Sequence, residues 1–156
     1  MNITLRPINL NDTDNIIKWR NTTFVLKQFI DQRPLDKQIH LNWYNKYILT
    51  NKAIQFIIVY NNIDIGSIFI KDINLINKSG ELGIFIGEQQ YTGKKIGQQA
   101  IKLISNYVFK NYNIDYIISR IKDTNISSIK AFEKVNYKQT HKIDNIIFMK
   151  IKKEEL

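Results

Sequence analysis

The sequence has no cysteine, and it has only 2 prolines and 6 glycines in 156 residues. The absence of cysteine excludes a disulfide-stabilised scaffold and a thiol nucleophile. No run approaches the roughly 18 apolar residues that a membrane-spanning helix needs. The segment from Met1 to Asp14 lacks the charged and then apolar layout of a secretory signal. These absences predict a cytoplasmic protein that does not enter a membrane.

The chain is strongly basic, with a formal net charge of +9. Its lysines are scattered, and no basic run with interleaved aromatic residues indicates a nucleic-acid strand as ligand. The charge therefore favours a small polyanionic ligand over nucleic acid. We expect no metal ion, and either a monomer or a homodimer. The length is typical of one core, so residues 1–156 are predicted to form a single domain.

The stretch from Gly80 to Ile104 organises the rest of the chain. Ile84–Ile86 is an apolar run between Gly83 and Gly87, which predicts a short buried strand with bulges at the glycines. A glycine-containing loop follows, and apolar residues then recur at helical spacing from Ile96 onward. A strand that enters a helix in this way directs free backbone N–H groups and the helix dipole at one point, which favours an anion.

The loop matches neither common nucleotide pattern. Gln98 stands where a P-loop needs lysine, and the dinucleotide pattern GxGxxG is absent. The run resembles instead the pyrophosphate loop [QR]xxGx[GA] of the GNAT superfamily of acyl-CoA-dependent N-acyltransferases. Gln90 and Gly93 match it, and Lys95 stands at the final position, normally glycine or alanine.

A second segment, Asn125 to Tyr137, resembles the later GNAT element N-x-x-[AS]-x-x-[FL]-Y-E-K-x-G-F. Asn125 and Ser128 are in register, whereas Phe132 replaces a common tyrosine and Asn136 replaces a common glycine. The order of predicted elements also matches the family along the whole chain. The resemblance implies a mixed α/β fold with a twisted, mostly antiparallel sheet of about seven strands, a splayed cleft and about four flanking helices.

Several local expectations accompany this fold. Asn11, Asp12 and Thr13 offer caps for a helix through Trp19, and Asp36 precedes a second helix. The predicted strands are residues 3–6, 54–60, 63–71, 84–86, 114–121, 137–141 and 146–151.

The resemblance also implies which residues hold acetyl-CoA. Backbone groups of the central strand would pair with pantetheine, the loop would hold the pyrophosphate, and the later helix would reach the arm from the far side. Asn125 is also expected to cap that helix. The cofactor residues implied are Phe85, Ile86, Tyr91, Gly93, Lys94, Lys95, Ile96, Gly97, Gln98, Asn125, Ser128 and Phe132.

Attack of an amine on a thioester is helped by a general base, because amines are mostly protonated at neutral pH. Glu81, at the start of the central strand, is our candidate base, and a solvated strand-end glutamate is the alternative. Arg20 and His40 resemble residues that face the nucleotide in one GNAT branch, and Lys71 is expected to join them. The alternatives are a surface ion pair for Arg20 and a histidine packed on Trp43 or Tyr44 for His40.

That branch acetylates nucleotide-linked 4-amino-4,6-dideoxy sugars, as in pseudaminic acid biosynthesis. The resemblance thus implies transfer of acetyl from acetyl-CoA to a small nucleotide-sugar acceptor. Two alternatives stay open, namely acetylation of the amino terminus of a ribosomal or other protein, and a coenzyme A-binding module without catalysis.

Overall fold

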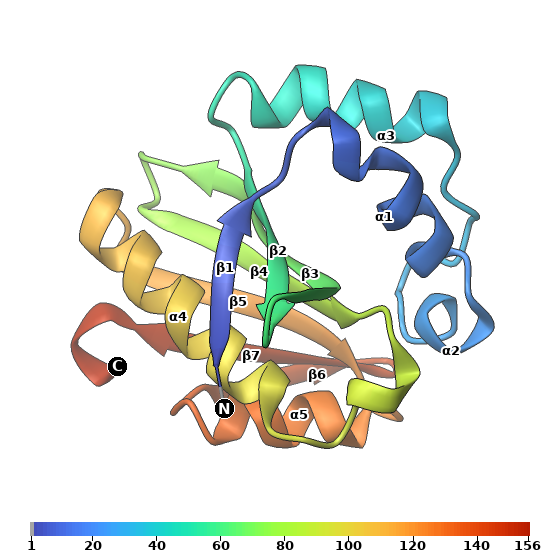
Figure 1. Ribbon diagram of the computed structural model, residues 1–156. Coiled ribbons are helices and arrows are strands. Elements are labelled where there is room, and N and C mark those ends of the chain that lie inside the picture. Colours follow the sequence, from blue (N-terminus) through green and yellow to red (C-terminus); the bar gives the residue numbers. More distant parts are fainter. Residues whose placement is uncertain (1) are drawn as a thin grey trace.

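The computed structural model describes residues 2–156, which form one seven-stranded sheet with helices on both faces (Figure 1). The strand order is β1-β2-β3-β4-β5-β7-β6, and only β4 and β5 run parallel. This confirms the predicted mixed α/β fold with a mostly antiparallel sheet. The strands are β1 Ile3–Pro7, β2 Ile54–Tyr60, β3 Ile63–Asn74, β4 Ser79–Ile86, β5 Tyr116–Lys122, β6 Lys138–Ile143 and β7 Ile146–Lys152.

Five α-helices of residues 2–156 flank the sheet, one more than expected, because the short α2 has no clear periodicity in the sequence. Among the helices of residues 2–156, none has the length and apolarity needed to span a membrane. The bounds are α1 Thr13–Arg20, α2 Thr23–Leu26, α3 Lys37–Trp43, α4 Ile96–Asn111 and α5 Ile126–Glu133, and a π-helical turn at Tyr44–Ile48 extends α3.

Asp36 caps α3 through its side chain, whereas none of the predicted residues Asn11, Asp12 and Thr13 does so for α1, although Asp12 occupies the N-cap position. Asp36 accepts a hydrogen bond from the Ile39 amide at 2.8 Å. Near α1, the side chain of Asn9 instead accepts from the Asn11 amide, at the start of a 3₁₀ turn that leads into the helix. The side chain of Asp12 pairs with Arg6, with Nη2 to Oδ1 at 2.7 Å, and also accepts from the Asn9 amide at 2.9 Å, so it makes no cap hydrogen bond to α1.

The two faces of the sheet carry separate hydrophobic clusters. On β2, Phe56 and Ile58 belong to the cluster covered by α4 and α5, and Ile57 belongs to the cluster covered by α1. Successive side chains of a strand point to opposite faces, so this continuous apolar run is buried on both sides. On β4, Phe85 faces Trp19 of α1, and the flanking Ile84 packs with the α4 cluster.

The parallel strands β4 and β5 separate soon after they meet. They pair at Ser79↔Tyr116, Gly80↔Ile117 and Glu81↔Ile118, and β4 continues to Ile86 without β5. The predicted splay in the sheet is therefore confirmed, and Glu81 lies at the fork.

The predicted bulge at Gly83 is wrong, whereas an irregularity of the bulge type is present at Gly87, where the amides of Gly87 and Glu88 both donate to the carbonyl of Ile65, at 2.7 and 3.2 Å. Pairing of β3 with β4 is regular from Gly66↔Ile86 to Lys71↔Glu81, and the register shifts only beyond Lys71. Both glycines serve close packing. A Cβ at Gly83 would lie 2.2 Å from Cζ of Phe69, and one at Gly87 would lie 2.2 Å from Cγ of Trp19. Each glycine thus admits an aromatic ring against the backbone.

Candidate active site

A cavity of about 1240 Å³ follows the fork between β4 and β5. One end is lined by the starts of α4 and α5, and the other by α1, α3 and the segment after α2. The structure brings nearly all predicted site residues to this cavity. They are Arg20, His40, Lys71, Glu81, Phe85, Ile86, Tyr91, Gly93, Lys95, Ile96, Gly97, Gln98, Asn125, Ser128 and Phe132.

The start of α4 fits a phosphate group. Within residues 2–156, no side chain caps this helix, so its first N–H groups are left for a ligand. Added Cβ atoms would meet nothing within 4 Å at Gly93, and at Gly97 only Ile84 Cδ1 at 3.9 Å. Lys95 adopts φ +62°, a left-handed conformation that glycine adopts at low cost, which explains the residue type usual in the family pattern.

The free edge of β4 fits an extended arm. Beyond Glu81, β4 has no partner strand on its β5 side in the described chain, and the carbonyl of Leu82 accepts from Ser119 Oγ at 2.9 Å. The edge after Leu82 therefore offers backbone groups to a ligand in the manner of an added strand. Asn125 faces this gap from α5 and accepts a weak hydrogen bond from the Ser128 amide at 3.4 Å, which confirms its expected capping role.

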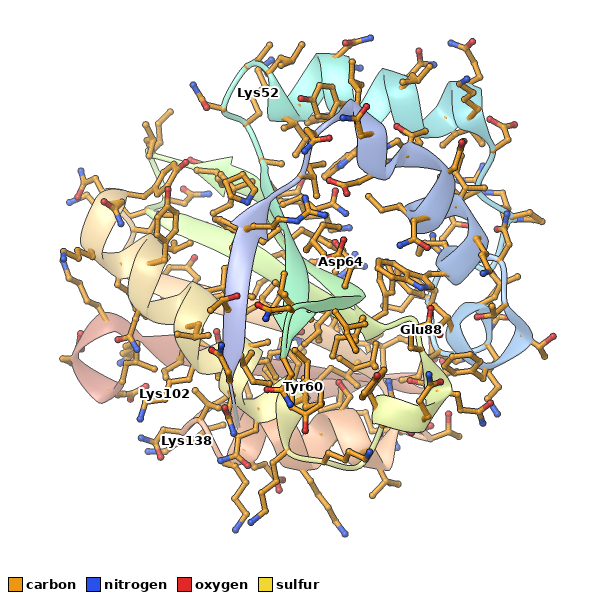
Figure 2. The ribbon with its side chains drawn as sticks, viewed as in Figure 1. Lys52, Tyr60, Asp64, Glu88, Lys102 and Lys138 are labelled. Carbon is orange, nitrogen blue, oxygen red and sulfur yellow. The ribbon has the colours of Figure 1, made fainter. Side chains whose placement is uncertain are left out.

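Lys94 is the one predicted cofactor residue outside the cavity lining. Its ammonium lies 5.4 Å from the ring centroid of Tyr91, which in turn packs edge-on against Tyr60, labelled in Figure 2. Glu88, also labelled there, accepts a hydrogen bond from Trp19 Nε1 at 3.0 Å. These contacts join the loop before α4 to β2 and α1.

Glu81 is an ion-paired carboxylate and not a solvated strand-end residue. Arg120 Nε donates to Oε1 at 2.7 Å, Arg120 Nη2 donates to Oε2 at 3.2 Å, and Lys71 Nζ lies 3.3 Å from Oε2. The hydrogen bond to Glu81 raises the pKa of Arg120 above its ordinary value. Three adjacent strands thus supply one charge cluster at the fork.

Arg20 and His40 both line the cavity, and each has one buried polar atom without a partner. Among the described residues, Arg20 Nη1 and His40 Nε2 are buried and have no hydrogen-bond partner. Burial lowers the pKa of Arg20 and of His40 below their ordinary values. A surface ion pair for Arg20 is therefore wrong, and its guanidinium lies over the face of the Phe29 ring, 3.6 Å from the centroid, in a cation–π contact.

The cavity is lined by more cations than anions. The two acidic residues are Asp31 and Glu81, and each is already paired, with Arg33 and with Arg120 respectively. An anionic ligand therefore meets a favourable potential along the whole cavity. The lining cations are Arg20, Lys27, Lys71, Lys95, Arg120, Lys130 and Lys134.

Phe132 lies on the cavity wall and is 1% exposed, with its ring 4.9 Å from that of Tyr137. The hydroxyl of Tyr137 is 2.8 Å from Ser105 Oγ, and burial raises the pKa of Tyr137. Tyr137 does not line the cavity, so it is not placed to substitute for the hydroxyl that Phe132 lacks.

The sequence did not reveal Arg120 or Phe29. Arg120 was not predicted as a site residue because its role depends on a contact with Glu81 across the fork. Phe29 was not predicted because it lies in a segment without periodicity. Gln55 was also missed. Gln55 lines the cavity. Its side chain accepts a hydrogen bond from Trp43 Nε1 at 2.9 Å and donates one to Ser67 Oγ at 2.9 Å. The available signal was the otherwise continuous apolar run of β2, which Gln55 interrupts.

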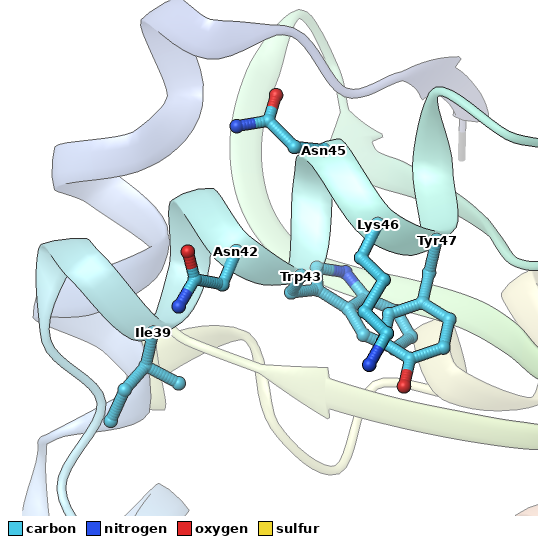
Figure 3. A pocket seen from close by; sticks show the side chains of 6 residues that line it. All are labelled: Ile39, Asn42, Trp43, Asn45, Lys46 and Tyr47. Atoms are coloured by element: carbon cyan, nitrogen blue, oxygen red, sulfur yellow. The ribbon is translucent and has the colours of Figure 1, made fainter.

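A second hollow, of about 610 Å³, lies outside the fork (Figure 3). It is formed by α3 and the π-helical turn, where Lys46 and Tyr47 stand beside Trp43. The rings of Trp43 and Tyr47 pack at an interplanar angle of 36°, with centroids 5.1 Å apart. In the part of the chain that the structure describes, no group of three or more His, Asp or Glu side chains is placed to hold a metal ion.

Known proteins share both the sequence pattern and the fold. Residues 2–138 match the family model described as an acetyltransferase (GNAT) domain. An uncharacterized protein of Methanocaldococcus jannaschii is 33% identical over 145 residues, or 90% of this chain, and the chain spans 29% of the length of that relative.

Two solved structures are similar to this one. A domain from Methanocaldococcus jannaschii has a TM-score of 0.84 at 30% identity, covering 97% of this chain and 98% of that one. The spermidine N-acetyltransferase of Vibrio cholerae, in complex with CoA and spermine, has a TM-score of 0.87 at 21% identity, covering 98% and 96%. The glycine-containing loop, the forked sheet and the family match together show that this chain belongs to the GNAT acetyltransferase family.

Proposed function

We propose that the protein transfers an acetyl group from acetyl-CoA to the amine of a nucleotide-linked 4-amino-4,6-dideoxy sugar. The observation that carries the proposal is the pair of buried atoms without partners, Arg20 Nη1 and His40 Nε2, at the acceptor end of the cavity. Burial of the Arg20 guanidinium is costly, and the charge of Asp31 offsets this cost only in part, so a phosphate that pairs with Arg20 would stabilise it further. His40 supplies a hydrogen bond to the same phosphate or to a hydroxyl.

The cationic side chains at the acceptor end of the cavity favour a nucleotide sugar over a polyamine as the acceptor. Arg20, Lys27 and Lys71 line that end, and the carboxylate of Glu81 is held by Lys71 and Arg120. A spermidine-like cation would meet like charges there, whereas a nucleoside diphosphate would meet opposite ones. The similar spermidine N-acetyltransferase therefore supports the fold of this site and not its acceptor.

Acetyl-CoA supplies the acetyl group in activated form, as a thioester. In the proposed reaction Glu81 takes the proton from the attacking amine, directly or through a water molecule, so that the amide C–N bond forms as the C–S bond breaks. Backbone N–H groups on the free edge of β4 are suited to stabilise the negative charge that develops on the carbonyl oxygen. Phe132 has no proton to donate, so we propose that the sulfur leaves as a thiolate.

The test is an acetyl-transfer assay with three groups of acceptors. The purified protein is incubated with acetyl-CoA and UDP- or dTDP-linked amino sugars, with spermidine, or with peptides that have free amino termini. We expect acetylation of a nucleotide-linked amino sugar. Activity on peptides alone would assign the protein to amino-terminal acetylation, and coenzyme A binding without any transfer would indicate a non-catalytic module.

A further inference from the structure

We infer that Phe29 is a positioning residue that holds Arg20 in the orientation needed for the acceptor. The guanidinium carbon of Arg20 lies 3.6 Å from the centroid of the Phe29 ring. Within residues 2–156, Arg20 forms no ion pair, its Nη1 has no hydrogen-bond partner, and the charge of Asp31 acts on it without direct contact, so the stack on Phe29 is the close contact that we take to orient the guanidinium. The inference for catalysis rests on the proposed function, in which Arg20 binds a phosphate of the acceptor.

The segment that carries Phe29 is fixed at both ends. At its start, Lys122 Nζ at the end of β5 donates to the carbonyl of Lys27 at 2.8 Å. At its end, Asn21 Nδ2 donates to the carbonyl of Leu35 at 2.7 Å, and the Leu35 amide donates to Asn21 Oδ1 at 2.8 Å. The segment from Lys27 to Leu35 is therefore anchored to the end of β5 at one end and to the residue after α1 at the other.

Phe29 also joins the acceptor end of the cavity to the cofactor strand. Its ring packs edge-on against Phe85 of β4, with centroids 5.8 Å apart, and Phe85 packs against Trp19 in the same way at 6.4 Å. Trp19 directly precedes Arg20 in α1. The packed rings of Phe29, Phe85 and Trp19 therefore fix both the backbone and the side chain of that arginine. An aromatic ring at position 29 matters because its face attracts a cation, which an aliphatic side chain does not.

The kinetic test compares Phe29→Leu with a rescue variant, Phe29→Tyr, and a matched control, Phe148→Leu. Phe148 is also partly buried but stacks on His141, away from the cavity. With a UDP-linked amino sugar, we expect Phe29→Leu to raise the KM of the acceptor about tenfold and to leave the KM of acetyl-CoA unchanged. Tyrosine should restore the wild-type value. An unchanged acceptor KM, or an equal rise for both substrates, would overturn the inference.

A second measurement does not depend on the acceptor. The Nε–Hε signal of Arg20 is recorded by ¹H–¹⁵N NMR and assigned by its loss in Arg20→Lys, among the signals of Arg6, Arg33 and Arg120. We expect the aromatic ring current to shift this signal upfield in the wild type and in Phe29→Tyr, but not in Phe29→Leu. An equal chemical shift of the Arg20 Nε–Hε signal in the wild type, Phe29→Tyr and Phe29→Leu would overturn the inference. If no nucleotide sugar is acetylated, the proposed function fails and this signal still decides the role of Phe29.

Discussion

The carboxylate of Glu81 accepts two hydrogen bonds from the guanidinium of Arg120, at 2.7 and 3.2 Å, where β4 and β5 part. This relationship fixes the carboxylate at the fork. Bidentate pairing with arginine is geometrically specific, so the carboxylate keeps one orientation toward the cavity. It also makes Arg120 the structural partner of the proposed base.

Glu81→Gln should lower kcat/KM for the acceptor by about 10²-fold, with the steepest loss at low pH. At low pH unprotonated amine is scarce, so removal of the group that takes the proton has its largest effect there. The measurement is the pH profile of kcat/KM, with the exposed Glu154→Gln as control. A profile that coincides with the wild type would show that Glu81 is only a structural ion-pair partner.

Gly97→Val should abolish coenzyme A binding and leave the fold intact. The space around an added Cβ at Gly97 is open, with Ile84 Cδ1 as the nearest atom at 3.9 Å, so the new side chain enters the proposed phosphate site and not the core. Calorimetry measures the affinity, and thermal unfolding checks the fold. The contrasting variant is Gly87→Ala, whose Cβ meets the Trp19 ring, and overpacking of this kind destabilises a protein by about 1–3 kcal/mol. Normal coenzyme A affinity in Gly97→Val would remove the loop from the cofactor site.

His40 should make the stability depend on pH in a defined direction. Burial lowers the pKa of His40 in the folded state below its ordinary value of 6.5, and the charge of Asp12 opposes this shift only in part. Below about pH 6.5 this histidine binds a proton more readily in the unfolded chain than in the folded protein. The free energy of unfolding should therefore fall as the pH decreases below about 6.5. In His40→Gln this part of the slope should disappear.

The measurement for His40 is urea unfolding at about pH 5.5 and about pH 7.5, on either side of the ordinary histidine pKa. His141→Gln is the control, because His141 is exposed on β6. If the free energy of unfolding changed equally with pH in His40→Gln and in the wild type, His40 would titrate in the folded protein as it does in the unfolded chain.

The sequence predicted the parts of the site that depend on local pattern. Gly93, at φ +74°, and Asn136, at φ +69°, both adopt the left-handed conformation that the family patterns require, and asparagine tolerates it better than most residues. The same reasoning missed Arg120 and Phe29. Their roles arise from contacts between segments distant in sequence, and neither spacing nor residue type marks such a contact in advance.

Phe132→Tyr should raise kcat by no more than about 10²-fold and preserve the affinity for acetyl-CoA. Phe132 lines the cavity and is buried, so the new hydroxyl would be close to the departing sulfur in the proposed reaction. The kinetic constants with acetyl-CoA and a nucleotide sugar measure the effect, and circular dichroism verifies folding. A folded variant with normal affinity and an unchanged kcat would show that protonation of the sulfur does not limit the reaction.

The central claim is that a phosphate of the acceptor pairs with Arg20. The most direct test is kcat/KM of Arg20→Gln for a UDP-linked amino sugar, compared with the free amino sugar that lacks the nucleotide, at saturating acetyl-CoA. Our account predicts a loss of about 10- to 100-fold for the nucleotide-linked acceptor, no loss for the free sugar, and an unchanged KM for acetyl-CoA. Equal losses for both acceptors, or no loss for either, would contradict it.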